Sequence, residues 1–166
     1  MPPVGSSDAC LLILGSLPGD ASLKSQRYYA HPQNQFWRLL GGAIGEDLAG
    51  LEYDLRLDRL TYRGIALWDV VGSASRVGSL DGAIRGATPN QLREYADTHP
   101  HLRAIAFNGK TAARLGKAVL DGLPGICLIE LPSSSPAYTL SFAEKAMAWA
   151  ALGPLACQQE VGKLAP

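Results

Sequence analysis

The stretch CLLILGSLPG (residues 10–19) is an unbroken apolar run that passes directly into a loop rich in Gly, Ser and Pro. Three later runs are similarly short and apolar: IALWDVV (65–71), RAIAF (103–107) and ICLIEL (126–131). Continuous rather than alternating apolar runs are typical of strands that are covered on both faces in a parallel sheet. We therefore expect four strands in a sheet that is mainly parallel.

Segments with a helical pattern lie between these runs, at residues 33–44, 53–60, 89–97, 111–120 and 141–152. For the third of them, Thr88 is the expected N-cap and Pro89 the first helical residue. This alternation predicts an α/β fold, a three-layer sandwich with a central, mainly parallel four-stranded sheet and helices on both faces. One domain is expected over residues 1–166, with a core at about 10–153 and a short, loosely held tail at 154–166.

The composition is that of an ordinary globular protein. The 166 residues are 47% hydrophobic and 18% charged, and the formal net charge is zero. A nucleic-acid partner is neither indicated nor excluded, since a local basic patch is sufficient for one. No apolar run approaches the roughly 18 residues that cross a bilayer, and residues 1–10 lack the pattern of a signal peptide. We expect a cytoplasmic protein without membrane contact.

The three cysteines, Cys10, Cys127 and Cys157, lie far apart and form no CxxC motif. Two of them lie in or beside apolar runs, so buried free thiols are expected. Three scattered thiols cannot supply the four ligands of a usual iron–sulfur cluster, and no histidine has the paired cysteines of a zinc site. The expectation is no metal and no cofactor.

Ligands of such folds bind outside the carboxyl ends of the strands. Four segments occupy these positions: residues 15–22, the residues from Asp69 onward, residues 108–111 and residues 132–137. They are rich in Gly, Pro, Ser or Asn, which suit exposed loops and backbone amides that face a ligand. The aromatic stretch YYAHPQNQFW (28–37) follows the first segment directly. We therefore assign it to the same functional rim.

Common nucleotide and hydrolase motifs do not fit these loops. GKT at 109–111 resembles the end of a P-loop, but Ala104 stands where that motif requires Gly. No GxGxxG follows the first strand, and the serine run at 133–135 lacks the GxSxG pattern. An esterase built from Ser135 and His31 is a weak alternative, and no pair of catalytic carboxylates is apparent.

Five motifs in order resemble one known family. They are GSLPG after the first strand, YYAHPxNxFW, LWDVV followed by SxSRxGSLD, FNG after the third strand, and the Ser/Pro loop after the fourth. Together they resemble the uracil-DNA glycosylase superfamily and, within it, the hypoxanthine (deoxyinosine) DNA glycosylase branch, often called family 6. The resemblance spans about residues 10–153. It implies a monofunctional glycosylase of base excision repair that hydrolyses the N-glycosidic bond of deaminated bases, hypoxanthine first and uracil as a further candidate, and leaves an abasic site.

The resemblance implies that Asn34, the Asn of HPxN, activates the attacking water. Pro32 suits the first helical position, which would place Asn34 in the first helical turn, where the helix dipole favours a polarised water. Capping of this helix is the alternative role for Asn34. In the related mismatch-specific uracil glycosylases an Asn stands at the position of Leu17, and leucine cannot orient water. Tyr29 aligns with the family's stacking aromatic, with packing in the core as its alternative.

The other aromatic residues of this stretch have different expectations. Phe36 and Trp37 are expected in the core, and Tyr28 fits either role. The residues expected at the flipped base are Ser16, Leu17, Gly19, Tyr29, His31, Asp69 and Asn108. Besides Tyr29, three of these have structural alternatives: Asp69 could tie the rim loops together, which we favour slightly, Asn108 could cap a helix, and His31 could pack against apolar groups or bond to backbone.

The loop after the fourth run resembles the superfamily's DNA-inserting loop. The residues expected to contact DNA are Ser133, Ser134, Ser135, Pro136, Ala137 and Lys110, and further basic residues near the rim are Lys24, Arg27, Arg76 and Arg114. A lyase step would need an amine in a recognisable site, and none is predicted. The expected partner is damaged duplex DNA, with single strands as a further candidate, and the expected state is a monomer.

Two rival functions stay open at this point. One is a uracil or G:U/G:T mismatch-specific DNA glycosylase. The other is a non-catalytic nucleic-acid or nucleotide-binding module, because Leu17 and Ser133 stand where relatives carry polar groups or a His or Asn.

Overall fold

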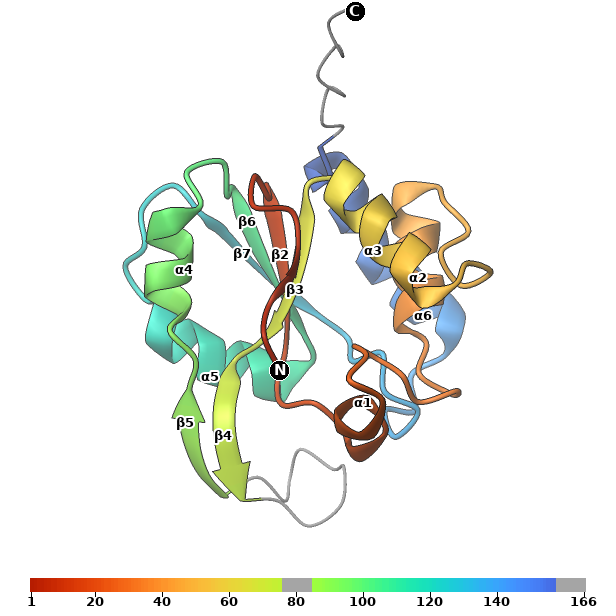
Figure 1. Cartoon of the computed structure of the whole chain (residues 1–166), viewed down its shortest axis with the longest axis horizontal. Helices are drawn as coiled ribbons and strands as arrows, with labels where there is room; N and C mark the ends of the chain where they lie inside the picture. The colour runs from red at the N-terminus through yellow and green to blue at the C-terminus, as the bar shows by residue number, and fades with distance from the viewer. Residues whose placement is uncertain (76–84, 158–166) are drawn as a thin grey trace, which may run out of the picture.

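A central sheet of five strands organises the protein (Figure 1). The computed structural model describes residues 1–75 and 85–157. The strand order is β1-β3-β2-β6-β7, with β1 at Val4–Gly5, β2 at Leu11–Gly15, β3 at Ile65–Asp69, β6 at Ala104–Asn108 and β7 at Cys127–Leu131. The four predicted strands are confirmed as parallel neighbours, whereas β1 pairs with β3 in the antiparallel sense. The predicted number of strands is corrected to five, because a two-residue strand that contains Gly5 carries no apolar pattern.

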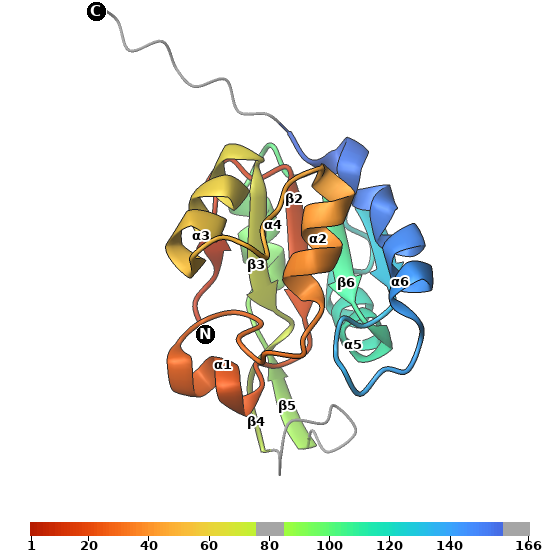
Figure 2. The same cartoon turned by 90° about the vertical axis from the view of Figure 1, so that its right-hand side faces the viewer.

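Helices cover both faces of the sheet, as predicted (Figures 1 and 2). α2 (Phe36–Ile44), α3 (Tyr53–Tyr62) and α6 (Phe142–Trp149) lie on one face, and α6 continues into a 3-10 helix at Ala150–Leu155. α4 (Leu92–Thr98) and α5 (Lys110–Leu120) lie on the other face. The short α1 (Asp20–Ser25) lies beyond the carboxyl end of β2. No helix in the described part of the chain is long and apolar enough to span a membrane.

β2 explains why its sequence is apolar without alternation. Every residue of this strand is buried. Leu11 and Ile13 pack into the core beneath α2, α3 and α6, whereas Leu12 and Leu14 pack into the core beneath α4 and α5. Successive side chains of a strand point to opposite faces, so a strand between two helical layers must be apolar at every position.

A hairpin replaces the predicted start of the third helix. β4 (Val71–Ser75) pairs antiparallel with β5 (Arg85–Pro89), and α4 begins only at Leu92. The backbone amide of Asn90 donates to the backbone carbonyl of Val70 (2.8 Å), which keeps the chain extended beyond Pro89. The predicted N-cap role of Thr88 is therefore wrong. Most of the motif SxSRxGSLD, including Arg76, lies outside the described residues.

Two of the three cysteines form a disulfide. Cys10 at the start of β2 is bonded to Cys157, which follows the 3-10 helix. Cys127 is free and exposed. The expectation of buried free thiols is therefore wrong, because spacing in the sequence does not show that the two ends of the chain meet. The predicted loose tail is also corrected at its start, since Leu155 packs against the core, whereas residues 158–166 lie outside the described part.

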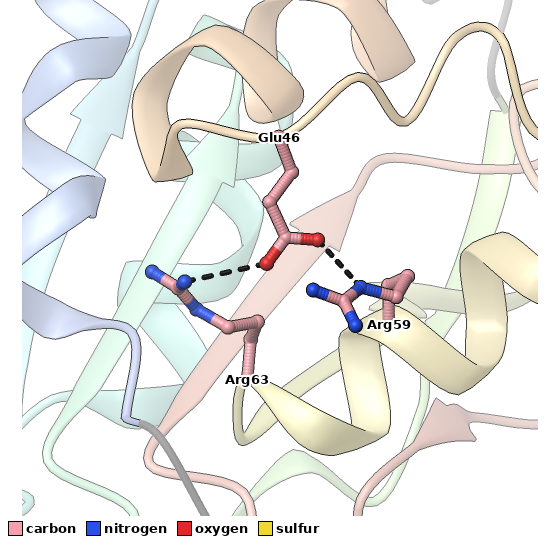
Figure 3. Close-up of polar contacts among 3 residues, drawn as sticks. All are labelled: Glu46, Arg59 and Arg63. Carbon is pink, nitrogen blue, oxygen red and sulfur yellow. Dashed lines mark hydrogen bonds and ion pairs between the residues drawn. The ribbon is translucent and has the colours of Figure 1, made fainter.

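The turn after α2 is held to the end of α3 by one carboxylate (Figure 3). Glu46 accepts from Arg59 Nε at 2.7 Å through one oxygen and from Arg63 Nη1 at 3.3 Å through the other. The side chains of Glu46 and Arg63 are 14% and 16% exposed. This cluster is structural, because it lies at the amino end of β3, away from the carboxyl ends of the strands.

Candidate active site

The last residues of the four parallel strands meet at one pocket. Gly15, Asp69, Asn108 and Leu131 end β2, β3, β6 and β7, and all four line a cavity of about 790 Å³. Small-molecule sites typically measure about 300–1,000 Å³. In Figure 2, α1 and the loop between β7 and α6 lie at this same end of the sheet. The structure thus brings the four rim segments inferred from the sequence into one site.

Gly15 allows two polar side chains to approach the end of β2. A Cβ atom at this position would lie 2.5 Å from Asp69 Oδ1 and 3.2 Å from the Tyr29 hydroxyl oxygen. The Val70 amide donates to the carbonyl of Gly15 at 2.8 Å, and the Val71 amide donates to the carbonyl of Ser16 at 2.9 Å. These bonds fix the first and second rim segments to each other. Any side chain at position 15 would therefore displace Asp69 or Tyr29.

The ring of Tyr29 is held in place by a second aromatic ring. Its ring stacks on Phe36, with 3.7 Å between the centroids and 9° between the planes. Tyr29 itself is half-buried, lines the pocket and has a φ of 54°, a left-handed conformation that is uncommon for such a residue. Strained backbone of this kind is often found at functional sites. Phe36 and Trp37 are buried in the core, as predicted.

Tyr28 belongs to the core, although it also borders the pocket. Its hydroxyl donates to the carbonyl of Pro2 at 2.8 Å. Burial, and secondarily the charge of Asp69, raise the pKa of the Tyr28 hydroxyl. Tyr28 therefore stays neutral at physiological pH and packs in the core near Asp69.

Asn34 lies just before α2 rather than inside it. α2 begins at Phe36, and a turn closed by the Asn34 amide and the His31 carbonyl (2.9 Å) contains Pro32. The predicted helical position of Pro32 is therefore wrong. The N-cap residue of α2 is Gln35, without a side-chain bond, but Asn34 Oδ1 accepts from the Phe36 amide at 3.0 Å, so Asn34 helps to cap the helix from one position earlier. Asn34 also lines the pocket and is half-buried, so the same side chain reaches the cavity.

Asn108 joins the end of β6 to the loop after β7. Its Nδ2 donates to Ser134 Oγ at 2.8 Å, and its Oδ1 accepts from the Ser134 amide at 2.8 Å. Both residues are buried. The N-cap of α5 is Gly109, without a side-chain bond, so the capping alternative for Asn108 is wrong. Asn108 instead fixes the position of the loop after β7.

Further contacts hold this loop, which we call the serine loop (residues 132–138). The Gln35 amide donates to the carbonyl of Ser134 at 3.0 Å. From α6, Lys145 Nζ donates to the carbonyl of Ser135 at 3.3 Å, and Trp149 Nε1 donates to the carbonyl of Pro132 at 3.0 Å. The serine loop is therefore held to the rest of the protein largely by its backbone carbonyls. Within the loop, Ser133 Oγ accepts from the Ser135 amide and Ser135 Oγ accepts from the Ala137 amide, both at 3.2 Å, so it is the hydroxyl protons of these two serines that remain for a ligand.

The remaining predicted residues are placed as follows. The pocket is also lined by Ser16, Leu17, Gly19, His31, Lys110, Ser133, Ser134, Ser135, Pro136 and Ala137. His31 is exposed, and its Nδ1 accepts from the Gln33 amide at 3.2 Å, which confirms the backbone-bonding alternative. Lys110, Pro136 and Ala137 are exposed, whereas Ser134 is fully buried.

Three of the basic residues expected near the rim do not line the pocket. Some residues that matter to the site were also not predicted from the sequence. Lys24, Arg27 and Arg114 are not among the described residues that line the cavity. Glu130 lines it and was missed, although a single charge inside an apolar strand was a usable signal. Lys145 does not line the pocket but binds the serine loop, and it was also missed, because nothing local in the sequence marks it as buried. In residues 1–75 and 85–157, no group of three His, Cys, Asp or Glu side chains could hold a metal ion.

Comparisons with known proteins define the class. The family described as the uracil DNA glycosylase superfamily matches residues 2–153. The chain belongs to this superfamily and is an enzyme of the DNA glycosylase class, so its substrate is DNA.

Individual proteins within this superfamily resemble the chain closely. The hypoxanthine DNA glycosylase of Methanosarcina barkeri is 47% identical over 109 residues, which cover 66% of this chain and 69% of the relative. The hypoxanthine DNA glycosylase of Methanosarcina acetivorans is 43% identical over 136 residues, which cover 82% and 85%. A solution NMR structure from Methanosarcina acetivorans, described as a candidate uracil DNA glycosylase, matches with a TM-score of 0.83 and 39% identity over 93% of this chain and 96% of that chain.

Proposed function

We propose that this protein is a monofunctional hypoxanthine DNA glycosylase, which hydrolyses the N-glycosidic bond of deoxyinosine in damaged DNA and leaves an abasic site. The observation that carries the proposal is that Asn34 and Tyr29, from the one stretch 28–37, both line the pocket at the strand ends. The names of the relatives from Methanosarcina barkeri and Methanosarcina acetivorans support hypoxanthine as the base.

In this proposal Asn34 orients the attacking water. An amide oxygen can accept two hydrogen bonds, and the Phe36 amide occupies one acceptor site of Asn34 Oδ1. The second acceptor site holds the water and directs its lone pair at C1′ of the sugar. The bond from the water oxygen to C1′ forms as the bond from C1′ to N9 breaks, and that electron pair leaves with the base. The proton that the water gives up is taken by the departing base, so the products are neutral hypoxanthine and a sugar with a 1′-hydroxyl group. The bond to Phe36 keeps the amide group from rotating, which is the requirement for preorganised catalysis.

Tyr29 supplies the platform for the flipped base. Extrusion of a nucleotide costs a few kcal/mol, and stacking on an aromatic ring returns about 1–3 kcal/mol per base. The stack on Phe36 keeps the Tyr29 ring in place before DNA arrives. Hypoxanthine offers acceptors at N7 and O6, which suit the Ser16 hydroxyl and the amides around Leu17 and Gly19.

Asp69 and Asn108 act mainly as supports in this scheme. Asp69 is 3% exposed and lies against Gly15 and Tyr29, which favours the role of tying the rim loops, with acceptance from N1–H of the base as the alternative. Asn108 acts through the serine loop, to which both of its amide atoms are bound. His31 contributes from the exposed edge of the pocket.

The serine loop and Lys110 hold the DNA strand. Pro136 and Ala137 are exposed and are suited to fill the gap that the flipped base leaves. Ser133, Ser135 and Lys110 face phosphates, whose contacts supply most of the sequence-independent affinity. Ser134 is fully buried, so it contributes through the backbone of the loop rather than by direct contact.

A second candidate is excision of uracil, including uracil or thymine opposite guanine. It is favoured by the description of the NMR structure from Methanosarcina acetivorans. Leu17 weighs against the mismatch-specific form, because an apolar side chain packed against the core cannot orient water. We rank uracil second as a substrate of the same site.

The test uses labelled duplexes that carry one deoxyinosine, uracil or deoxyxanthosine, followed by alkali to cleave abasic sites. Strand breaks with deoxyinosine that depend on alkali are the expected result. Absence of breaks on all three duplexes would refute the enzyme, and breaks without alkali would refute the monofunctional mechanism. Single-stranded versions of each substrate test strand preference.

The proposal also includes a single domain over residues 1–166, a monomer and a cytoplasmic location. Disulfides are uncommon in the cytosol of mesophiles, so the redox state of Cys10 and Cys157 in cells is a direct check on the location. Sedimentation with and without a deoxyinosine duplex checks the monomer.

A further inference from the structure

Lys145 is a buried charged residue that the proposed reaction does not use. It lies on α6, and only 1% of it is exposed. Its Nζ donates to Gln35 Oε1 at 3.0 Å and to the carbonyl of Ser135 at 3.3 Å, and the Tyr138 ring centroid lies 5.5 Å away. It therefore touches both the residue after Asn34 and the serine loop.

These contacts place Lys145 between the two halves of the site. The backbone amide of Gln35 donates to the carbonyl of Ser134, while the side-chain oxygen of Gln35 accepts from Lys145. The carbonyl of Ser135 accepts from both Lys145 and the Tyr138 amide, the latter at 3.1 Å. Trp149, one helical turn beyond Lys145 on the same side of α6, anchors Pro132. The segment that carries Asn34 and the serine loop are thus joined through one ammonium group.

The energetics argue that this ammonium has a role beyond packing. Burial lowers the pKa of the Lys145 amine, and within residues 1–75 and 85–157 its hydrogen-bond partners are neutral oxygens. A buried charge without a counter-ion is expensive, and an apolar side chain of similar size often gives equal or better stability. A chain under selection for stability alone would favour Met or Leu here.

We propose that Lys145 is a positioning residue, which joins the serine loop to the start of α2 so that the loop and Asn34 meet the flipped nucleotide at a fixed separation. This inference rests on the proposed function, since it assigns the loop to DNA and Asn34 to water. Lys145 is not itself a nucleophile, because it is absent from the described residues that line the pocket and its ammonium already binds two protein oxygens.

The test compares three variants: Lys145→Met, Gln35→Leu and the double variant. The readouts are the single-turnover rate of base release at saturating protein, the melting temperature and amide exchange of Tyr138. Displacement of reacting groups by about 1 Å can cost about 10²-fold in rate. We expect Lys145→Met to lose about this much rate and to speed Tyr138 exchange at least about tenfold, because that amide shares its acceptor with Lys145.

The double variant separates positioning from stability. Replacement of both partners of a buried hydrogen bond by apolar groups can be nearly neutral for stability. The melting temperature should therefore recover in the double variant, while the rate stays as low as in Lys145→Met alone, because both changes remove the same link. Wild-type rate in the folded single or double variant would overturn the inference.

Arg38→Met is the matched control. Arg38 is exposed on α2, with its guanidinium carbon 4.3 Å from the ring centroid of Phe142 on α6, so this change removes one positive charge and one contact between the same two helices. Its rate should equal that of the wild type, and an equal loss would overturn the inference. A borohydride-trapped adduct that requires Lys145 would also do so, because Lys145 would then be a nucleophile.

Failure of the proposed function gives a different pattern. If wild-type protein releases no base from any duplex, the glycosylase proposal falls. The Tyr138 exchange rate and the affinity for a duplex with a tetrahydrofuran abasic analogue then decide on Lys145. If Lys145→Met changes neither, Lys145 does not position the loop.

Discussion

The side-chain amide group of Asn34 has two roles, one in capping α2 and one in the pocket. Its oxygen caps the first amide of α2, and its side chain lines the pocket. The two duties are compatible, because a capped amide group has a fixed orientation and still has a second acceptor site. The capping contact therefore supports the catalytic proposal instead of replacing it.

The first prediction separates these duties. Asn34→Ala should lower the single-turnover rate of base release about 10²–10³-fold, which is the usual effect of removing one preorganised polar group. It should also cost about 1 kcal/mol of stability through the lost cap. Asn34→Ser is the control, because serine is a good capping residue without an amide. The serine variant should recover stability and stay inactive, and activity near that of the wild type in either variant would contradict the assignment.

Gly15 gives a second prediction at the scale of one residue. Gly15→Ala places a methyl group 2.5 Å from Asp69 Oδ1, so the buried carboxylate or Tyr29 must move. Overpacking of this kind typically costs about 1–3 kcal/mol, and the rate of base release should fall more than about tenfold. Melting curves and single-turnover assays measure both effects.

Gly42→Ala is the matched control for this substitution. Gly42 lies exposed in α2, and nothing lies within 4 Å of its added Cβ. Alanine is favoured over glycine inside a helix by about 1 kcal/mol, so this variant should be as stable as the wild type or more so. Equal behaviour of the two alanine variants would show that the crowding at Gly15 is unimportant.

At the scale of elements, the order of the four parallel strands and of the five longer helices could be predicted, whereas β1, α1, the hairpin of β4 and β5, and two helix starts could not. Pro32 and Pro89 both look like first helical residues, yet Pro32 lies in a turn and Pro89 ends β5. Local preference allows proline in each of these settings. The choice was made by long-range bonds, such as that between Asn90 and Val70, which are invisible in a local pattern.

The start of α6 is different, because its capping residues are neighbours in the sequence. Ser141 Oγ accepts from the Glu144 amide, and the Glu144 carboxylate accepts from the Ser141 amide at 3.1 Å. The hydrogen bonds from the Ser141 side chain and backbone lower the pKa of Glu144. This capping box sets the direction of the helix that carries Lys145.

The third prediction concerns the charge in this capping box. A carboxyl group with a lowered pKa stabilises the fold above its unfolded pKa, and this contribution is lost as the pH falls through the folded value. Glu144→Gln keeps an acceptor but removes the charge. The wild type should therefore melt at a higher temperature than the variant at pH 7, and the difference should vanish well below the ordinary pKa of a glutamate. A difference that is constant from pH 7 to pH 3 would contradict this explanation.

At the scale of the whole molecule, the position of the site could be predicted from the fold, but the hydrogen bonds between its residues could not. The rule that ligands bind at the carboxyl ends of parallel strands pointed to Gly15, Asp69 and Asn108, and all three line the pocket. The pairing of Asn108 with Ser134 and of Gln35 with Lys145 joins segments that are distant in the sequence. No periodicity or spacing carries such pairings, because they depend on the side-chain geometry of the folded chain.

The disulfide is a second long-range contact and gives the last prediction. Cys10 and Cys157 are separated by 147 positions, so the bond closes a loop that contains almost the entire fold. A loop of that length restricts the unfolded chain by about 5 kcal/mol in the chain-entropy model, and measured losses typically fall at about 2–5 kcal/mol. Cys157→Ser should therefore lower the free energy of unfolding by about 2–5 kcal/mol, as measured by denaturant titration.

Base release should be unaffected below the unfolding transition, because Cys10 directly precedes β2 whereas the pocket lies at the other end of this strand, at Gly15. Reductant should destabilise the wild type to the level of the variant and leave the variant itself unchanged. Cys127→Ser is the control, since that thiol is exposed and unbonded. If wild type and Cys157→Ser unfold at the same denaturant concentration without reductant, the bond does not stabilise the protein in solution. Residues 155–157 are then held by the packing of Leu155 and Ala156 and by the hydrogen bond from the Cys157 amide to the Arg63 carbonyl.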